Sequence, residues 1–311
     1  MRLLTVSLGG VDRRQGIANG ETHAFFTLAL AIAATLVSSM THAAEPVWRT
    51  SRDVVTRAQS SISRLDAAGV ESVIARLPKS LSLIRADLRD KDVQVYLHKG
   101  DLTIDASFVN THALVVDGNL TIRGSYDDFR GGGIGILAVL GDLRAEHVVS
   151  WGSMAVTGRL DATGLVYAYY NDFSFEVAGP VKARAVVVFD KSTNNPRIEA
   201  TINQSDGRND AALSVRHFVP ELMIEDILDS TEADGTELLA VASYDTARKR
   251  IVAGLPIFRE HPAPESLAND VLRLFRPGLD AATRTRLANS DPLLAMVARE
   301  TGGKDAIQRA P

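Results

Sequence analysis

The chain has 311 residues and carries 34 lysines and arginines against 38 aspartates and glutamates, a net charge of −4. This acidic balance gives no electrostatic reason to bind nucleic acid. The sequence contains no cysteine, which excludes disulfides, thiolate metal sites and a cysteine nucleophile.

Residues 1–43 have the features of an export signal. A charge-free run at 24–37 is shorter than the ~20 residues that cross a bilayer, but it suits the apolar core of a signal peptide. Small residues at Thr41 and Ala43 favour cleavage after Ala43. We therefore expect a periplasmic or secreted protein with no stable membrane span after cleavage. An uncleaved N-terminal anchor is the alternative.

Residues 44–90 are predicted to form a helical N-terminal cap. Val54, Ala58 and Ile62 fall on one helical face, and Gly69 is placed to end that helix. An open apolar end of a repeat domain would invite edge-to-edge pairing. We therefore expect this segment to cover the first coil of the domain that follows.

Residues 91–203 contain a short pattern that recurs five times. Its core reads GDLTI, GNLTI, GDLRA, GRLDA and GPVKA, and its glycines are Gly100, Gly118, Gly141, Gly158 and Gly179. Apolar residues recur two and four positions on either side of each glycine, which is the alternation of a β-strand. A unit of about 20 residues cannot bury its apolar side alone, so the copies must stack. The pattern predicts a mainly β fold, a single-stranded β-solenoid of about five coils with helical N- and C-terminal flanks.

Charged residues at the outward positions of the repeat support this stacking. Stacked coils place residues of equal offset in columns with a spacing of ~4.8 Å. In two such columns the signs alternate, Asp105–Arg123–Glu146 and Arg144–Asp161–Lys182. Opposite charges on neighbouring strands stabilise each other by about 0.2–1 kcal/mol. We interpret both columns as structural ladders on a solvated face.

Two segments are candidate binding sites: an insertion at 126–133 and a tyrosine-rich corner at 167–172. Aromatic side chains with amide and carboxylate neighbours can stack on a sugar or on a loop of a partner protein, and Asp190 would lie one coil later. The alternatives are a flexible loop for the insertion and a bulky corner that fills the space between coils. The candidate ligand- or partner-binding residues are Tyr167, Tyr169, Tyr170, Asn171, Asp172 and Asp190.

No catalytic or metal-binding pattern stands out. His98, His112 and His147 occupy different offsets from the repeat glycines, so no histidine column forms for a metal, and we expect no cofactor. Asp142, His147 and Trp151 belong to different parts of one coil. Acidic residues alternate with basic ones, and no carboxylate pair stands out as a general acid and its partner. This pattern argues against an enzyme without excluding one, and the catalytic residues of an enzyme would be unknown.

Residues 204–311 are predicted to be mainly helical. Helix candidates begin at Pro220 and Pro264, and Ser290-Asp291-Pro292 combines cap residues with a first-turn proline. We expect this region to pack on the other end of the solenoid.

With these residues in view, the repeat over 93–190 resembles that of the polymer-forming β-helix proteins called bactofilins. It is also similar to uncharacterised bacterial proteins with GDL-type repeats and a Tyr-Tyr-Asn corner. The resemblance implies a compact right-handed β-helix that assembles end to end into filaments without nucleotide. Bactofilins have disordered tails and a cytoskeletal role, whereas this chain has predicted caps on both sides and an export signal. We therefore retain the fold and discount the filament.

The sequence as a whole favours a non-enzymatic structural or interaction protein of the bacterial envelope. It would present the aromatic and polar corner to a protein partner or a glycan. A carbohydrate-active β-helix enzyme of the envelope is one alternative. A self-assembling bactofilin-like scaffold, which requires an uncovered solenoid end, is another.

Overall fold

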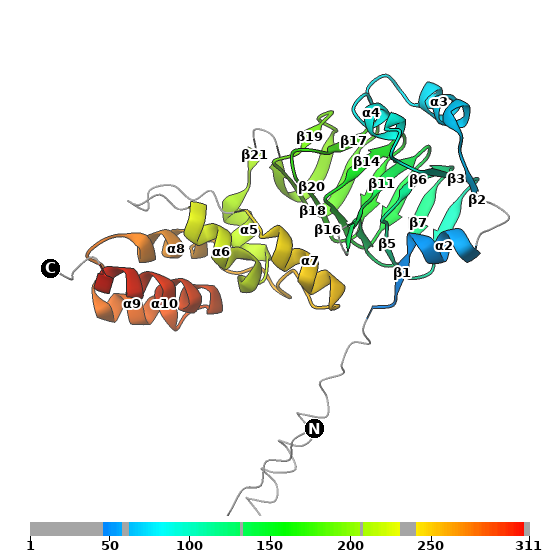
Figure 1. Ribbon diagram of the computed structural model, residues 1–311. Coiled ribbons are helices and arrows are strands. Elements are labelled where there is room, and N and C mark those ends of the chain that lie inside the picture. The colour runs from blue at the N-terminus through cyan, green and yellow to red at the C-terminus, as the bar shows by residue number, and fades with distance from the viewer. Residues whose placement is uncertain (1–45, 58–61, 131–132, 206–207, 231–240, 308–311) are drawn as a thin grey trace, which may run out of the picture. The chain divides into compact units, whose positions relative to one another are not determined.

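The computed structural model (Figure 1) describes residues 46–57, 62–130, 133–205, 208–230 and 241–307. The expected signal segment at 1–43 lies outside these residues. The centre of the described chain is a parallel β-solenoid of about six turns, which confirms the predicted mainly β solenoid. The sixth turn begins at Ser192 and continues through Ile198 without a repeat glycine, which makes one turn more than the five predicted.

Each coil contributes strands to three lateral faces, which we number in chain order. The first face consists of β3 (Val95–Lys99), β6 (Ala113–Asp117), β11 (Ile136–Val139), β14 (Ser153–Val156), β17 (Ser174–Val177) and β19 (Ser192–Thr193). The second face consists of β4 (Leu102–Ile104), β7 (Leu120–Ile122), β12 (Leu143–Ala145), β15 (Leu160–Ala162) and the first halves of β18 (Val181–Phe189) and β20 (Ile198–Ser205). The third face consists of β5 (Ser107–Val109), β8 (Tyr126–Asp127), β13 (Val148–Ser150), β16 (Leu165–Tyr169) and the second halves of β18 and β20.

The repeat glycines are needed because successive coils approach each other closely at these positions. The amide of Gly158 donates to the carbonyl of Gly141 at 2.9 Å, and that of Gly179 to Gly158 at 3.0 Å. A Cβ atom on Gly158 would lie 2.2 Å from Asp142 Oδ1 and 2.8 Å from the Gly141 carbonyl carbon. Among the five repeat glycines only Gly100 has a positive φ, 86°. Close approach, rather than a turn conformation, therefore requires glycine in the later coils.

The residue after each glycine holds the next coil in register. Asp101 Oδ1 accepts the amide of Asn119 at 2.7 Å, Asn119 Oδ1 accepts that of Asp142 at 2.8 Å, and Asp142 Oδ1 accepts that of Arg159 at 3.0 Å. The ladder ends where Arg159 cannot accept and Pro180 has no amide hydrogen to donate. The Gly-Asp and Gly-Asn pairs of the repeat thus have a structural role.

The insertion after the second coil is shorter than expected and forms a hairpin. Tyr126 is fully buried in the solenoid interior, in register with Phe108 and Val148. Beyond Asp127, β9 (Phe129–Arg130) and β10 (Gly133–Ile134) pair antiparallel. The expectation of a loop from residue 126 was wrong, because the first two of these residues complete the strand of the coil.

The N-terminal elements lie against the first coil. The strand β1 (Trp48–Thr50) pairs with β5, and β2 (Ile62–Arg64) pairs antiparallel with β3. Between them, α2 (Ser51–Arg57) places Val54 in the same hydrophobic cluster as the solenoid interior. The expected helix through Ile62 with its end at Gly69 was wrong, since Ile62 lies in a strand and Gly69 in the first turn of the next helix. Pairing with an open strand edge outweighed the helical pattern of this segment.

Two helices cover the first face of the solenoid. The helices are α3 (Ala67–Arg76) and α4 (Ile84–Arg89). Their apolar residues cluster with outward side chains of the first face, among them Leu97, Val115 and Ala138. Glu176, fully buried, accepts the amides of Ser82 at 2.8 Å and Ile84 at 2.9 Å. This carboxylate anchors the start of α4 on the face.

The C-terminal region packs along the third face. It contains the short strand β21 (Arg208–Asn209) and the helices α5 (Ala211–His217), α6 (Pro220–Ser230), α7 (Tyr244–Val252), α8 (Leu267–Phe275), α9 (Ala281–Ala288) and α10 (Pro292–Ile307). Its hydrophobic cluster includes the outward residues Val149, Tyr167, Val187 and Ile202 of the third face. Helices lie at the ends of the solenoid, as predicted, and the contacts of this region also extend along the third face, because that face has apolar outward positions that require cover.

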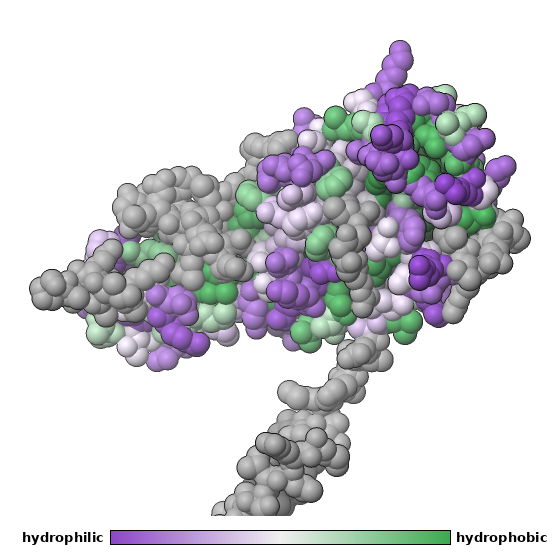
Figure 2. Space-filling view, viewed as in Figure 1, coloured by the Kyte–Doolittle hydropathy of each residue, from purple (hydrophilic) through white to green (hydrophobic). Residues whose placement is uncertain are grey.

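The second face differs because its outward residues are polar. These residues are Thr103, Thr121, Arg144, Asp161, Lys182 and Glu199, and the hydrophobic clusters of the described residues include none of them. The predicted column is present: Arg144 is in register with Asp161, and Asp161 with Lys182. In the space-filling view, hydrophobic residues form small patches interspersed with hydrophilic ones (Figure 2). None of the helices in the described part is long and apolar enough to cross a membrane.

We expect Gly158→Ala to lower the free energy of unfolding by about 2 kcal/mol, because the added methyl group overpacks two coils. The matched control is Gly302→Ala in α10, where a Cβ would meet nothing within 4 Å; this change should be neutral or slightly stabilising. Urea unfolding followed by far-UV circular dichroism compares the two variants. Equal unfolding midpoints would contradict the close-approach explanation.

Candidate functional site

An aromatic column occupies the corner where the third face passes into the first. The ring of Trp151 stacks between Phe129, with centroids 4.8 Å apart and planes at 22°, and Tyr170, with centroids 4.5 Å apart and planes at 20°. The three rings come from the insertion hairpin and from two successive coils. The two segments singled out in the sequence, the insertion and the tyrosine-rich corner, therefore meet at Trp151. We call this region, with Tyr169 and residues 171–172 and 189–190, the aromatic corner.

A second stack lies beside the first. Tyr169 and Phe189 are nearly parallel, with centroids 6.1 Å apart and planes at 3°. Phe189 is 50% exposed, so part of this ring remains open to solvent. The two residues are in register on β16 and β18. Equal offsets in successive coils thus produce a stack of rings along the corner.

The backbone at this corner adopts an uncommon conformation. Tyr170 has a φ of 91°, and Asp190, one coil later, has a φ of 47°. Side chains other than glycine rarely adopt positive φ, and a bulky one does so only where its surroundings impose it. A hydrogen bond to Asp172 raises the pKa of the Tyr170 hydroxyl. Asn171, Asp172 and Asp190 are exposed, so polar groups surround the rings.

Tyr167 lies apart from the other five predicted residues. It is almost fully buried, and its hydroxyl donates to the carbonyl of Ala242 at 2.5 Å. Its ring meets Tyr244 edge to face, with centroids 5.2 Å apart. Tyr167 thus attaches the third face to the C-terminal helices and does not reach the exposed corner.

Two buried charges hold the turn that carries Trp151. Asp128, fully buried, accepts the amides of Trp151 at 2.6 Å and Gly152 at 3.0 Å and the Ser150 hydroxyl at 2.8 Å. From the other side, the Lys191 ammonium donates to the carbonyls of Gly152 at 2.6 Å and Trp151 at 2.8 Å. The turn is therefore clamped between an acidic and a basic side chain from different coils.

Burial governs the protonation of this clamp. Desolvation raises the pKa of Asp128 to about 6, an effect that the nearby Lys191 charge opposes. Desolvation lowers the pKa of Lys191 to about 8. Both groups are charged at neutral pH. Neither residue was identified as a site residue from the sequence. Their contacts with the turn at 150–152 join parts of the chain that have no equivalent contact in the other coils, so no repeating pattern indicates them.

The helix α7 completes the corner from outside the solenoid. Arg248 donates through Nε to both carboxylate oxygens of the buried Asp127, at 3.1 and 3.0 Å, and also contacts the Phe129 carbonyl. The ring of Tyr244 meets Trp151 with centroids 5.4 Å apart and planes at 60°. The corner therefore depends on the solenoid, the hairpin and the C-terminal region together.

Trp151 could have been found from the sequence. It lies three residues after Val148, as Tyr169 lies three after Val166, and these valines are in register.

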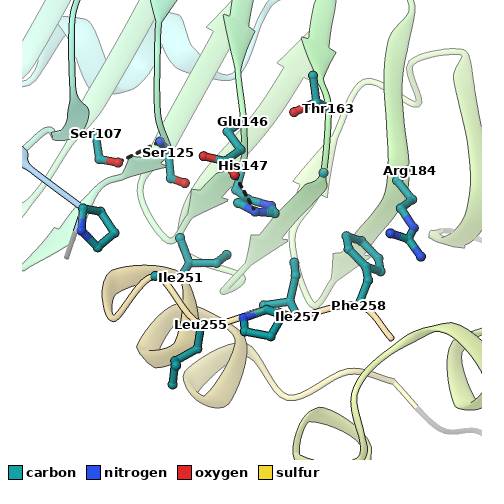
Figure 3. Close-up of a pocket in the computed structure, with 14 residues that line it drawn as sticks. Ser107, Ser125, Glu146, His147, Thr163, Arg184, Ile251, Leu255, Ile257 and Phe258 are labelled. Atoms are coloured by element: carbon teal, nitrogen blue, oxygen red, sulfur yellow. Dashed lines mark hydrogen bonds and ion pairs between the residues drawn. The ribbon is translucent and has the colours of Figure 1, made fainter. Parts of the chain in front are cut away.

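A pocket of about 440 Å³ separates the solenoid from the segment after α7 (Figure 3). His147 lines it, and its Nδ1 accepts the amide of Leu165 at 2.9 Å. Burial lowers the pKa of His147 to about 4, so the ring is neutral at pH 7 with its proton on Nε2. Ser125 lies on the neighbouring coil, just before the residue whose amide donates to the His147 carbonyl. The imidazole nevertheless has no free lone pair to accept the Ser125 hydroxyl proton. This arrangement does not support acyl transfer. No cluster of three metal-ligating side chains occurs among the described residues.

The comparisons with known proteins leave the family open. No protein-family model and no solved structure matches the chain. Over 115 residues the chain is 28% identical to the uncharacterized protein YdbD of Escherichia coli strain K12, covering 36% of this chain and 14% of that protein's length. Because this relative is itself uncharacterized, the match assigns no function, and the likeness to bactofilins stays a prediction.

We expect Asp128→Asn to change how stability depends on pH. The folded-state pKa of Asp128 is about 6, above the ordinary 3.8. Ionisation of the buried carboxylate therefore lowers the unfolding free energy of the wild type by its full amount above pH 6, and by nothing below about pH 4. An asparagine keeps an acceptor for both amides without this cost. The difference in unfolding free energy, variant minus wild type, should rise by roughly 2–3 kcal/mol between pH 4 and 6.5.

Urea unfolding across this pH range measures the difference. The opposite effect of His147, whose neutral form favours folding above its pKa of about 4, is present in both proteins and cancels. Parallel stability curves would show that Asp128 is not buried as described.

Proposed function

We propose that the protein is a non-enzymatic interaction module of the bacterial envelope whose aromatic corner binds a glycan. The observation that carries the proposal is Phe189, a half-exposed ring stacked on Tyr169, whose neighbour in the chain, Tyr170, is held at positive φ. An aromatic face next to polar groups suits a sugar, which offers C–H groups on one side and hydroxyls at its edge. Asn171, Asp172 and Asp190 supply such polar groups.

The rigidity of the corner supports a binding role. The clamp of Asp128 and Lys191 and the ion pair of Arg248 with Asp127 hold the rings in place before any ligand arrives. A preorganised site loses less conformational entropy on binding than a flexible one. A ladder that only fills space between coils would not need an exposed ring at its end.

The envelope location rests on the export-signal features of residues 1–43. These features suit a periplasmic or secreted protein.

The alternatives have weaker support. A carbohydrate-active enzyme would need two carboxylates, and Asp161 and Glu199 stand in one column of the second face. Each is already paired with an arginine, Asp161 with Arg159 at 3.6 Å and Glu199 with Arg197. A self-assembling scaffold requires uncovered solenoid ends. In the described part, the outer edge of β20 meets β21 only at its last residues and is otherwise unpaired. The first coil, by contrast, is paired with β1 and β2, which opposes end-to-end growth from that end.

Phe189→Ala should weaken glycan binding about tenfold, because the open ring is the main apolar contact. A glycan microarray identifies ligands of the wild-type chain, and titration calorimetry compares the variants with the best of them. The control is Leu83→Ala, which removes another exposed hydrophobic side chain on the N-terminal elements and should leave affinity unchanged. Absence of glycan binding by the wild type, or equal affinity of Phe189→Ala, would overturn the proposal.

A further inference from the structure

The second face contains a groove, and none of the residues that line it belongs to the aromatic corner. Its volume is about 750 Å³, and it runs across the strands β12, β15, β18 and β20. One wall is the outward column of Arg144, Asp161, Lys182 and Glu199, and the other includes Thr163, Arg184 and Thr201. Because successive strands lie ~4.8 Å apart, both walls present a side chain at each coil along the solenoid axis.

The groove is basic although the chain as a whole is acidic. Four basic side chains line it, Arg144, Arg159, Lys182 and Arg184, against two acidic ones, Asp161 and Glu199. Asp161 lies between two arginines, 3.6 Å from Arg159 and 4.0 Å from Arg144. Glu199 is paired with Arg197.

Two cations of the groove form no ion pair in the described part, although Lys182 lies in register between Asp161 and Glu199. In the described part of the chain, neither Lys182 nor Arg184 has a carboxylate within ion-pair distance. Lys182 is exposed at the centre of the groove. These charges are available to an anionic ligand.

Arg184 is held in position by the C-terminal region. Its guanidinium lies 4.1 Å from the centroid of the Phe258 ring and donates to the Arg259 carbonyl at 3.4 Å. Such a guanidinium keeps its remaining donors in a fixed plane, which suits a carboxylate. The solenoid and the segment after α7 thus build this cation together.

The groove continues into the pocket of Figure 3 through Thr163 and Arg184, which line both. On the solenoid wall of the pocket lie the Ser125 hydroxyl and His147 Nε2–H, which are hydrogen-bond donors, and the Glu146 carboxylate, whose Oε1 is 3.8 Å from His147 Nε2. On the opposite wall lie apolar side chains, including Leu255, Ile257 and Phe258. Gly164 leaves room for the imidazole, since a Cβ there would lie 2.2 Å from His147 Cε1. Polar groups facing an apolar wall fit a sugar ring, which has hydroxyls at its edge and C–H groups on its face.

We propose that the groove and pocket bind an acidic glycan, a chain of sugars with carboxylate groups, laid along the solenoid axis. Lys182 and Arg184 pair with carboxylates, the threonines and Ser125 bond hydroxyls, and the apolar wall contacts a sugar ring in the pocket. The residues that line the groove include no aromatic side chain, and the Phe258 ring of the pocket is already in contact with Arg184 and stacked on Phe218, so the site has no free ring on which nucleic-acid bases could stack. This site is independent of the aromatic corner and of the function proposed for it.

Calorimetric titration of the full chain with polygalacturonate tests the proposal. Lys182→Gln and Arg184→Gln should each weaken binding about three- to tenfold, and added salt should weaken binding by the wild type. Lys79→Gln makes the same charge change at an exposed position outside the groove and should leave affinity unchanged. Asp161→Asn, which releases Arg144 and Arg159, should tighten binding. Thermal unfolding of each variant confirms that it is folded.

Other polymers and variants decide the ligand class. A neutral glucan and polyphosphate should bind more weakly than polygalacturonate. Equal binding of polyphosphate, equal effects of Lys79→Gln and Lys182→Gln, or no binding of polygalacturonate at low salt would each overturn the inference. Phe189→Ala should leave polygalacturonate binding unchanged, which separates this site from the aromatic corner.

Discussion

The apolar outward side chains of two solenoid faces dictate how the rest of the chain is arranged. Leu97 and Val115 on the first face, and Val149 and Val187 on the third, point away from an interior that is already filled. Each square ångström of apolar surface covered contributes about 25 cal/mol. The N-terminal helices therefore lie on the first face and the C-terminal helices on the third. The second face, polar at every outward position, needs no cover and remains available to ligands.

Stacking in register explains the remaining features with one mechanism. Parallel strands bring residues of equal offset into columns, whatever their chemistry. The columns of this solenoid include a carboxylate and amide ladder from Asp101 to Asp142, charges from Arg144 to Glu199, and rings from Trp151 to Phe189. The first column maintains the register, and the other two create surfaces of defined chemistry.

The corner is more costly to build than the faces. Asp128 and Lys191 are charged and buried, and burial of either alone would be strongly unfavourable. Their bonds to both sides of one turn, between Ser150 and Gly152, compensate for that cost. Such expense at a corner that carries a tyrosine with positive φ is consistent with a binding role.

What recurs along the chain could be predicted from the sequence. The five glycines predict the solenoid, and the alternating charges predict the pairing of Arg144 with Asp161 and of Asp105 with Arg123, whose side chains lie 3.2 Å apart. Contacts that occur once could not be predicted, such as that between Arg248 and Asp127, which joins residues 121 positions apart. The position of the C-terminal region depends on many such contacts.

The boundaries of the N-terminal helix were predicted incorrectly for a related reason. The segment from Val54 to Ile62 has a helical pattern, but the open edge of β3 recruits Ile62 into a strand. Tyr167 lies in a tyrosine-rich, polar segment typical of an exposed corner, but its side chain packs against the C-terminal helices. In both cases a tertiary partner overrides a local preference.

The assignment of two covered faces and one bare face can be tested directly, because the chain has no cysteine of its own. Single cysteines at Val115, Val187 and Lys182 would report on the first, third and second faces through their rates of maleimide labelling. We expect cysteines at positions 115 and 187 to react roughly a hundredfold more slowly than one at position 182. Equal rates at positions 187 and 182 would show that the C-terminal region does not cover the third face, and would contradict the account.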